Sequence, residues 1–161
     1  MTRFTRTKQF NYKINEEYFL SLVNFVLMNI NNSSSIKNLI SNYQDLQLEW
    51  IIEYSDLPWD WKLLSVNPSV TKEWLDIFGL KLLYNISENP NLQLDWLLEY
   101  PNFRWDWRSI SLHKNLRLEW LLKFPKKIWD WRSISLRKNL RLEWLLRFPY
   151  KSWNWDSISE N

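Results

Sequence analysis

The chain has 161 residues, no cysteine, one glycine and 13 tryptophans. The absence of cysteine excludes disulfides and thiolate metal sites, and a single glycine argues against a β-rich fold or a glycine-rich phosphate loop. The net charge of +3 is unevenly distributed: residues 14–100 carry four basic and twelve acidic side chains, whereas residues 101–161 carry thirteen basic and six acidic ones.

The first 35 residues are predicted to form a basic arm and a capping helix. Residues 1–13 contain four basic side chains and no acid. Residues 15–30 form a largely apolar run, with Asn15 as a candidate N-cap and glutamates at the next two positions, where the helix dipole favours acids. The run resembles a secretory signal, but polar residues interrupt it, and it is too short and polar to span a bilayer. A loop is expected at residues 31–35.

From residue 36 onward the sequence repeats with a period of about 24 residues. One tryptophan of each unit follows this register, at Trp50, Trp74, Trp96, Trp120 and Trp144. A serine keeps the same phase, at Ser41, Ser65, Ser87, Ser111, Ser135 and Ser159. A fixed period of this length indicates one small structural unit stacked on copies of itself. We therefore predict an all-α solenoid of about five α/3-10 repeats, with residues 36–161 as one continuous array.

Each repeat is predicted to contain two short helices. Residues 115–124 have apolar side chains at helical spacing, with Asn115 as the candidate N-cap and Pro125 as the stop. The following residues 129–136 are predicted to form a shorter helix, α or 3-10, that Asp130 caps. We term these two segments helix A and helix B.

The second repeat departs from this pattern. It is two residues shorter than the others, and Lys81-Leu82-Leu83 stands where four other units have Trp-Asp-Trp or Trp-Asn-Trp. A local irregularity is therefore expected at residues 79–86.

Most tryptophans are expected to fill the core between stacked helices, because aromatic side chains at structural spacing bury large apolar areas. The alternative is a row of exposed indoles that stack on bases, sugars or proline-rich segments. The tryptophans nearest the loops are the candidates for exposure: Trp59, Trp105, Trp129 and Trp153.

The C-terminal repeats gather basic residues in columns that stacking would align. Such a surface is either a solvated basic face or a site for an acidic partner, since fields of this kind steer association. The partner could be an acidic protein surface, nucleic acid, or the acidic part of another copy. The candidate binding residues are Arg104, Arg108, Lys126, Lys127, Arg132, Arg137, Lys138, Arg141 and Lys151.

Catalysis, metal binding and a cofactor have little support in the sequence. The single histidine, His113, occupies a column that holds Arg137 in the next repeat, which favours a surface variant over a catalytic base. The recurring acids occupy helix-start positions, where the helix dipole explains them. We expect no enzyme activity, no small-molecule substrate, no metal and no membrane span.

Two resemblances arise at the residues of one segment. The stretch 64–75, with its Asn-Pro pair followed by an acid and aliphatic residues, resembles the repeat of leucine-rich variant proteins, which alternate α- and 3-10 helices. The stretch 58–68, which contains Trp-Asp-Trp, is similar to tandem repeats encoded by large double-stranded DNA viruses. The second resemblance covers residues 36–161 and implies a virion or host-cytoplasm location. The Asn-Pro pair becomes His113-Lys114 later in the chain, so no role tied to that pair is carried over.

The combined prediction is a non-enzymatic repeat scaffold that mediates protein–protein interaction. The viral resemblance implies a structural or assembly component of a large DNA virus. The alternative is a nucleic-acid-binding protein that uses the basic C-terminal repeats as phosphate contacts with little sequence readout.

Overall fold

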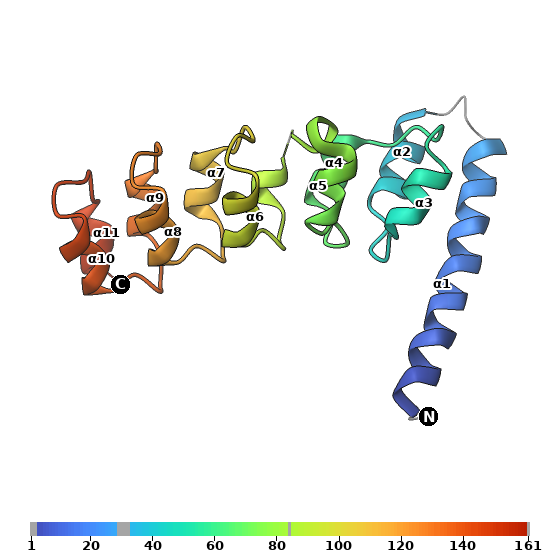
Figure 1. Cartoon of the computed structure of the whole chain (residues 1–161), viewed down its shortest axis with the longest axis horizontal. Helices are drawn as coiled ribbons and strands as arrows, with labels where there is room; N and C mark the ends of the chain where they lie inside the picture. The colour runs from blue at the N-terminus through green and yellow to red at the C-terminus, as the bar shows by residue number, and fades with distance from the viewer. Residues whose placement is uncertain (1–2, 29–32, 84, 161) are drawn as a thin grey trace. The chain divides into compact units, whose positions relative to one another are not determined.

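The computed structural model describes residues 3–28, 33–83 and 85–160, with the backbone alone for residues 3–15 and 33–36. The described residues form short helices in a repeating order and contain no strand (Figure 1). The predicted all-α repeat fold is therefore confirmed. The chain forms two compact units, Met1–Tyr84 and Asn85–Asn161. That one array runs through both units stays a prediction.

The first unit contains a long N-terminal helix and the first repeats. Its elements are α1 (Arg3–Met28), α2 (Ser33–Ser41), α3 (Leu48–Glu53), α4 (Trp61–Val66), α5 (Glu73–Phe78) and the 3-10 helix η1 (Gly79–Leu82). Helix α1 buries Phe19, Val23 and Val26, and the Phe19 ring stacks on Trp50 with centroids 4.2 Å apart. The N-terminal helix thus covers the apolar end of the first repeat, as predicted for a helical cap.

Three details of the N-terminal prediction were wrong. Helix α1 begins at Arg3, so the basic segment is helical, and Asn15 lies inside the helix instead of at its N-cap. Helix α2 begins at Ser33, within the stretch predicted as a loop; residues 29–32 lie outside the described residues. Once a helix has formed, each added residue gains a backbone hydrogen bond without a new nucleation step, and arginine and lysine are good helix formers. The packed part of α1 can therefore extend through the basic segment.

The second unit contains a 3-10 turn followed by three helix pairs. Its elements are η2 (Ile86–Glu88), α6 (Leu94–Glu99), α7 (Trp107–Leu112), α8 (Leu118–Lys123), α9 (Trp131–Ser135), α10 (Leu142–Arg147) and α11 (Trp155–Ser159). Helices α6, α8 and α10 are A helices, and η2, α7, α9 and α11 occupy the B position. Successive B elements pack side by side, η2 with α7, α7 with α9, and α9 with α11.

Helix A ends where the sequence indicated but begins later than expected. Helix α8 ends at Lys123, two residues before Pro125. Its N-cap is Arg117, which makes no side-chain capping bond, so the prediction that Asn115 caps the helix was wrong. The Asn115 amide instead donates to the carbonyl oxygens of Pro90 (3.2 Å) and Leu92 (2.9 Å) in the preceding repeat.

The first tryptophan of each Trp-Asp-Trp or Trp-Asn-Trp motif is buried, contrary to prediction. Trp129 is 5% exposed, and its indole Nε1 donates to the Phe124 carbonyl at 2.9 Å, just past the end of α8. The same bond, with the carbonyl five residues earlier, recurs at Trp59, Trp105 and Trp153. Because the one polar atom of the indole is satisfied locally, the whole ring can leave water.

The middle residue of the motif caps helix B. The Asp130 carboxylate accepts from the backbone N–H of Ser133 at 3.2 Å, which confirms the predicted cap. Asp60, Asp106 and Asn154 cap their helices in the same way. Asparagine replaces aspartate at the last of these positions, so the cap needs the side-chain oxygen and not a full charge.

The last residue of the motif packs on the repeat that follows. In the second unit, the Trp107 ring lies 5.0 Å from both Phe124 and Trp129, centroid to centroid. The Trp131 ring repeats this arrangement with the Phe and Trp of its next repeat. Aromatic rings from neighbouring repeats thus interdigitate, which is the core packing that the spacing predicted.

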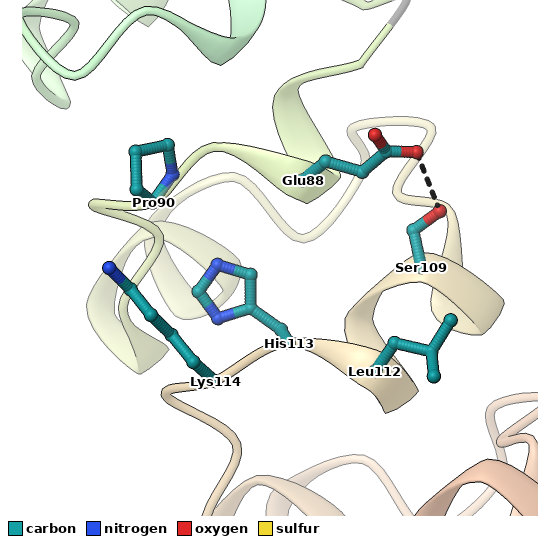
Figure 2. A pocket seen from close by; sticks show the side chains of 6 residues that line it. All are labelled: Glu88, Pro90, Ser109, Leu112, His113 and Lys114. Atoms are coloured by element: carbon teal, nitrogen blue, oxygen red, sulfur yellow. Dashed lines mark hydrogen bonds between the residues drawn. The ribbon is translucent and has the colours of Figure 1, made fainter.

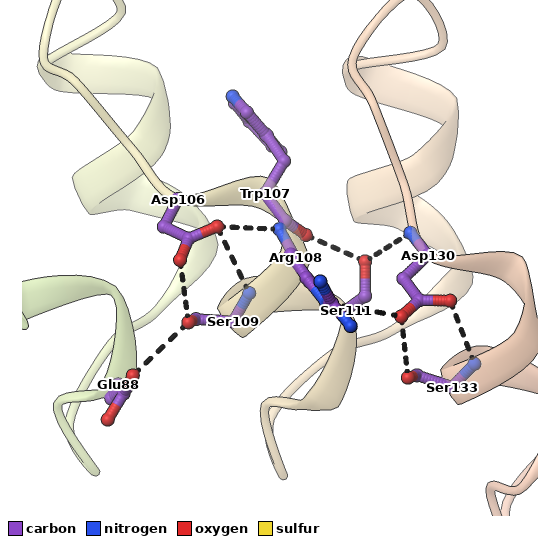
Figure 3. A network of polar contacts seen from close by, with 8 residues as sticks. All are labelled: Glu88, Asp106, Trp107, Arg108, Ser109, Ser111, Asp130 and Ser133. Carbon is purple, nitrogen blue, oxygen red and sulfur yellow. Dashed lines mark hydrogen bonds and ion pairs between the residues drawn. The ribbon is translucent and has the colours of Figure 1, made fainter.

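A buried serine joins one repeat to the next, as Figure 3 shows for Ser111. Ser111 is fully buried; its hydroxyl donates to the Trp107 carbonyl at 2.7 Å and accepts from the Asp130 backbone N–H at 2.9 Å. Ser41, Ser87 and Ser135 accept the equivalent N–H bond from 19 residues further along. The serine column therefore gives a backbone N–H of the incoming motif an acceptor in the preceding repeat.

Candidate binding surface

A column of residues just after helix B ties each repeat to the one before it. Asn67 Nδ2 donates to the Tyr43 carbonyl at 2.9 Å, and His113 Nε2 makes a 2.8 Å bond to the Asn89 carbonyl. Arg137 Nη1 donates to the His113 carbonyl at 2.9 Å. Each bond spans 24 residues, or one repeat. The residues in this column differ in charge, but they share a side-chain donor that reaches a carbonyl of the preceding connection.

His113 is buried, so its prediction as a surface variant was wrong. It is 7% exposed, and its Nδ1 accepts from the Asn115 backbone N–H at 3.1 Å. A carbonyl can only accept and a backbone N–H can only donate, so the ring is the neutral tautomer with its proton on Nε2. Burial lowers the pKa of His113; the Asn89 carbonyl opposes this, and the charges of Lys114 and Arg137 reinforce it. This histidine is a neutral structural group.

Arg137 is a fixed charge and not a freely moving phosphate contact. Its guanidinium also donates to the carbonyls of Lys114 (3.3 Å) and Leu116 (3.4 Å) and, through Nε, to Asn139 Oδ1 (3.1 Å). Burial, and after it the charge of Arg117, lowers the pKa of Arg137, yet a guanidinium stays protonated in proteins. These neutral oxygens hold the guanidinium in place.

The other predicted binding residues are exposed but do not form one face. They are Arg104, Arg108, Lys126, Lys127, Arg132, Lys138, Arg141 and Lys151. In the second unit the loops between helices A and B lie at one end of the helices, and the B-to-A connections lie at the opposite end (Figure 1). Lys126 belongs to the first set, whereas Lys138 and Arg141 belong to the second. The predicted binding residues therefore separate onto two edges, which we call the A-to-B edge and the B-to-A edge after the connections that form them.

Cations of the A-to-B edge are partly used within the fold. Lys127 Nζ lies 5.2 Å from the centroid of the Trp107 ring, and Lys151 Nζ lies 5.5 Å from that of Trp131. At such distances an ammonium is attracted by the negative face of the indole. In α7, Arg108 Nε lies 3.8 Å from the Asp130 carboxylate, although the arginine side chain is 82% exposed. These groups cover and bridge successive repeats.

A hollow of about 510 Å³ lies on the B-to-A edge of the second unit (Figure 2). This His113 hollow is lined by Glu88, Pro90, Ser109, Leu112, His113 and Lys114. Leu112 and Lys114 are exposed, and the Ser109 hydroxyl donates to the Glu88 carboxylate at 3.2 Å. The hollow has apolar walls, a neutral imidazole, and one charge of each sign.

A second hollow, of about 360 Å³, follows directly. This Arg137 hollow is lined by Leu112, Lys114, Ser133, Leu136, Arg137, Lys138 and Asn139. It shares Leu112 and Lys114 with the His113 hollow. Within the described part of the chain, the ammonium groups of Lys114 and Lys138 make no ion pair. Three cations and no acid line this hollow.

A third hollow, of about 280 Å³, is lined by Arg117, Leu118, Glu119, Asn139, Arg141, Glu143 and Trp144. Its two arginines face two glutamates, so the local charge is balanced. The structure thus brings together Arg137 and Lys138 and places Arg141 in a different electrostatic setting. Lys114 and Arg117 were missed as candidates. The substitution of Pro90 by Lys114 and then by Lys138 in one column was the signal that could have identified the first.

The described residues offer no metal site and no membrane span. Among them, no group of three or more histidine, aspartate or glutamate side chains could hold a metal ion. No helix within the described ranges is long and apolar enough to cross a bilayer. The only histidine is held in a structural role, which leaves the repeated hollows as the candidate site.

No family model, curated protein or solved structure matches this chain. The resemblance to viral Trp-Asp-Trp repeats therefore stays a prediction, and the candidate site is assigned from its geometry.

Proposed function

We propose that the chain is a non-enzymatic repeat scaffold that binds an acidic protein surface along the B-to-A edge of its C-terminal repeats. The observation that carries the proposal is the Arg137 hollow, where Lys114, Arg137 and Lys138 line one concave site without an acid. Such a site favours carboxylates by charge, and its leucine walls favour a partner with apolar side chains.

The partner is either another protein or the acidic region of another copy, since residues 14–100 carry a large excess of acids. The resemblance to viral repeats extends the proposal to a structural or assembly role in a large DNA virus. Size-exclusion chromatography with light scattering at low and high salt tests self-association. A monomer under both conditions removes the second copy as the partner.

Binding of nucleic acid is the alternative, and the burial of the aromatic rings argues against base stacking. Among the described tryptophans only Trp155, at 60%, is largely exposed. A single-strand binding surface needs a series of accessible rings beside its cations. The basic edge could still contact phosphates, so the experiment compares the two classes of partner directly.

The test uses the full chain and labelled polyglutamate, with DNA and RNA oligonucleotides of matched charge. Polyglutamate is expected to bind at low salt, and Lys138→Glu is expected to weaken binding because it places an acid in the Arg137 hollow. Lys126→Glu is the matched control, since it makes the same charge change on the opposite edge. Equal effects of the two variants, or tighter binding of nucleic acid than of polyglutamate, would contradict the proposal.

A further inference from the structure

The two hollows that share Leu112 are copies of one another. Adding 24 to a residue number gives the equivalent position one repeat later. For the His113 hollow, this shift converts Pro90, Ser109 and Leu112 into Lys114, Ser133 and Leu136. The same shift converts Glu88, His113 and Lys114 into Leu112, Arg137 and Lys138. Every residue produced by the shift lines the Arg137 hollow. The site is therefore a repeated concavity that the B-to-A edge presents twice in succession.

The two copies differ in charge: the first is balanced and the second is positive. In the His113 hollow the charges of Glu88 and Lys114 balance, and Pro90 and Leu112 supply apolar surface. In the Arg137 hollow the acid has become a leucine, the proline a lysine, and the neutral imidazole a guanidinium. The first copy suits an uncharged apolar side chain, whereas the second suits a carboxylate beside an apolar wall.

The spacing of the two copies selects an extended ligand. Helices α7 and α9 pack side by side, and packed helices lie roughly 8–10 Å apart. A polyproline II segment rises about 3.1 Å per residue with three residues per turn, so side chains at i and i+3 project on one side about 9 Å apart. A β-strand returns to the same side after two residues, or about 6.7 Å, which is too short.

We infer that the His113 and Arg137 hollows together bind one extended peptide segment, with an apolar side chain in the first and an aspartate or glutamate side chain three residues away in the second. This inference rests on the proposed function, which requires only an acidic protein partner. It adds a residue spacing, a backbone conformation and a defined order of chemistry along the edge.

The test uses fluorescein-labelled proline-rich peptides that contain one leucine and one glutamate two, three or four residues apart, in both orders. Binding to the full chain is measured by fluorescence anisotropy. The three-residue spacing in one order is expected to bind roughly tenfold more tightly than the other spacings, and replacing its glutamate by glutamine should cost about tenfold, the loss of one charge-assisted contact.

Protein variants assign the two side chains to their hollows. Lys138→Glu is expected to abolish the preference for glutamate over glutamine, whereas Lys126→Glu should retain it. Pro90→Ser, at a residue that lines the His113 hollow but not the Arg137 hollow, should reduce the affinity for the leucine peptide but change little for its alanine counterpart. Circular dichroism of each variant checks that the helices are retained.

Equal affinity for all three spacings would overturn the inference, and so would a total lack of peptide binding up to about 1 mM, the weak limit of specific recognition. Either result can occur while polyglutamate still binds and responds to Lys138→Glu, so failure of the peptide inference is distinguishable from failure of the proposed function.

Discussion

The second and fourth repeats differ in the residues that join them to the preceding helix B. In the fourth repeat, the Asp130 N–H donates to Ser111 of the preceding helix B, the indole of Trp129 donates to the Phe124 carbonyl, and Asp130 caps α9. In the second repeat, Lys81-Leu82-Leu83 occupies the motif position, and the Leu82 carbonyl lies 2.9 Å from Ser65 Oγ. Lys81-Leu82-Leu83 contains neither an indole nor a side-chain acceptor, so it cannot supply the indole bond or the helix cap of Trp-Asp-Trp.

The irregularity expected in the shorter second repeat takes the form of two 3-10 helices, η1 and η2. Gly79, at φ +38°, ends α5 and allows the chain to enter η1. The B position of this repeat is then η2, a single 3-10 turn whose N-cap residue, Asn85, makes no side-chain capping bond. The difference indicates that helix B needs a side-chain capping bond to extend beyond one turn.

The largest expected effect on stability comes from removing the buried indole of Trp129, which is hydrogen-bonded to the Phe124 carbonyl. Trp129→Ala should lower the free energy of unfolding by about 3–5 kcal/mol, because it leaves a cavity and removes the indole bond to the Phe124 carbonyl, which keeps the Lys127 N–H as a donor. Trp155→Ala is the control, since that ring is 60% exposed. Urea denaturation followed by circular dichroism measures both, and a similar loss in the two variants would refute the assigned role of the motif.

The serine column allows a sharper test of the link between repeats. Ser111→Ala removes the acceptor of the part-buried Asp130 N–H and should cost about 1–3 kcal/mol. Ser159→Ala, in the same column, should cost less, because Ser159 is exposed and its hydroxyl donates to the Asp156 carbonyl at 2.7 Å. If Ser159→Ala is the more destabilising of the two in matched urea titrations, the proposed role of the serine link does not hold.

The column after helix B makes stability depend on pH through His113. Because the folded state lowers the pKa of His113, its contribution to stability is complete above the unfolded value of about 6.5 and is lost as pH falls through the folded pKa. The unfolding midpoint should therefore decrease as pH falls below about 6.5.

His113→Asn is the variant that isolates this dependence. Asn67, in the same column, donates to the Tyr43 carbonyl, and its Oδ1 accepts from the Ser69 N–H at 2.8 Å. An asparagine can therefore replace both bonds of the histidine without titrating. The variant should flatten the pH profile below about 6.5. An unchanged slope would assign the dependence to another group.

The smallest expected effect at neutral pH is that of Asp130→Asn. Asn154 already caps α11 through its side-chain oxygen, in a bond to the Ser157 N–H at 3.3 Å, so the loss should remain below about 1 kcal/mol. Burial would raise the pKa of Asp130, but bonds from Ser133 and the charge of Arg108 keep it lowered.

The Asp130 contribution should thus be complete above about pH 3.9 and lost as pH falls below it. Asp130→Asn should weaken this acidic part of the stability profile and leave the His113 part intact. Thermal melts across both pH ranges separate the two contributions.

The sequence by itself determined the repeat period, the helical class, the stops of helix A and the cap of helix B. These features depend on neighbours within a few residues: apolar spacing brings Trp120 and Leu121 to the core, Pro125 interrupts the helix, and Asp130 reaches the N–H groups of its own first turn. Local geometry is enough for such predictions.

Only the tertiary structure decided which side chains are free for a partner. The exposure of Trp129 depends on a carbonyl that its indole reaches, and the roles of His113 and Arg137 depend on carbonyls one repeat away. Residue type indicated charge, but contacts across 24 residues use Arg137 internally while leaving Lys138 exposed beside it. Stacking brings together residues whose bonding partners the linear pattern does not specify.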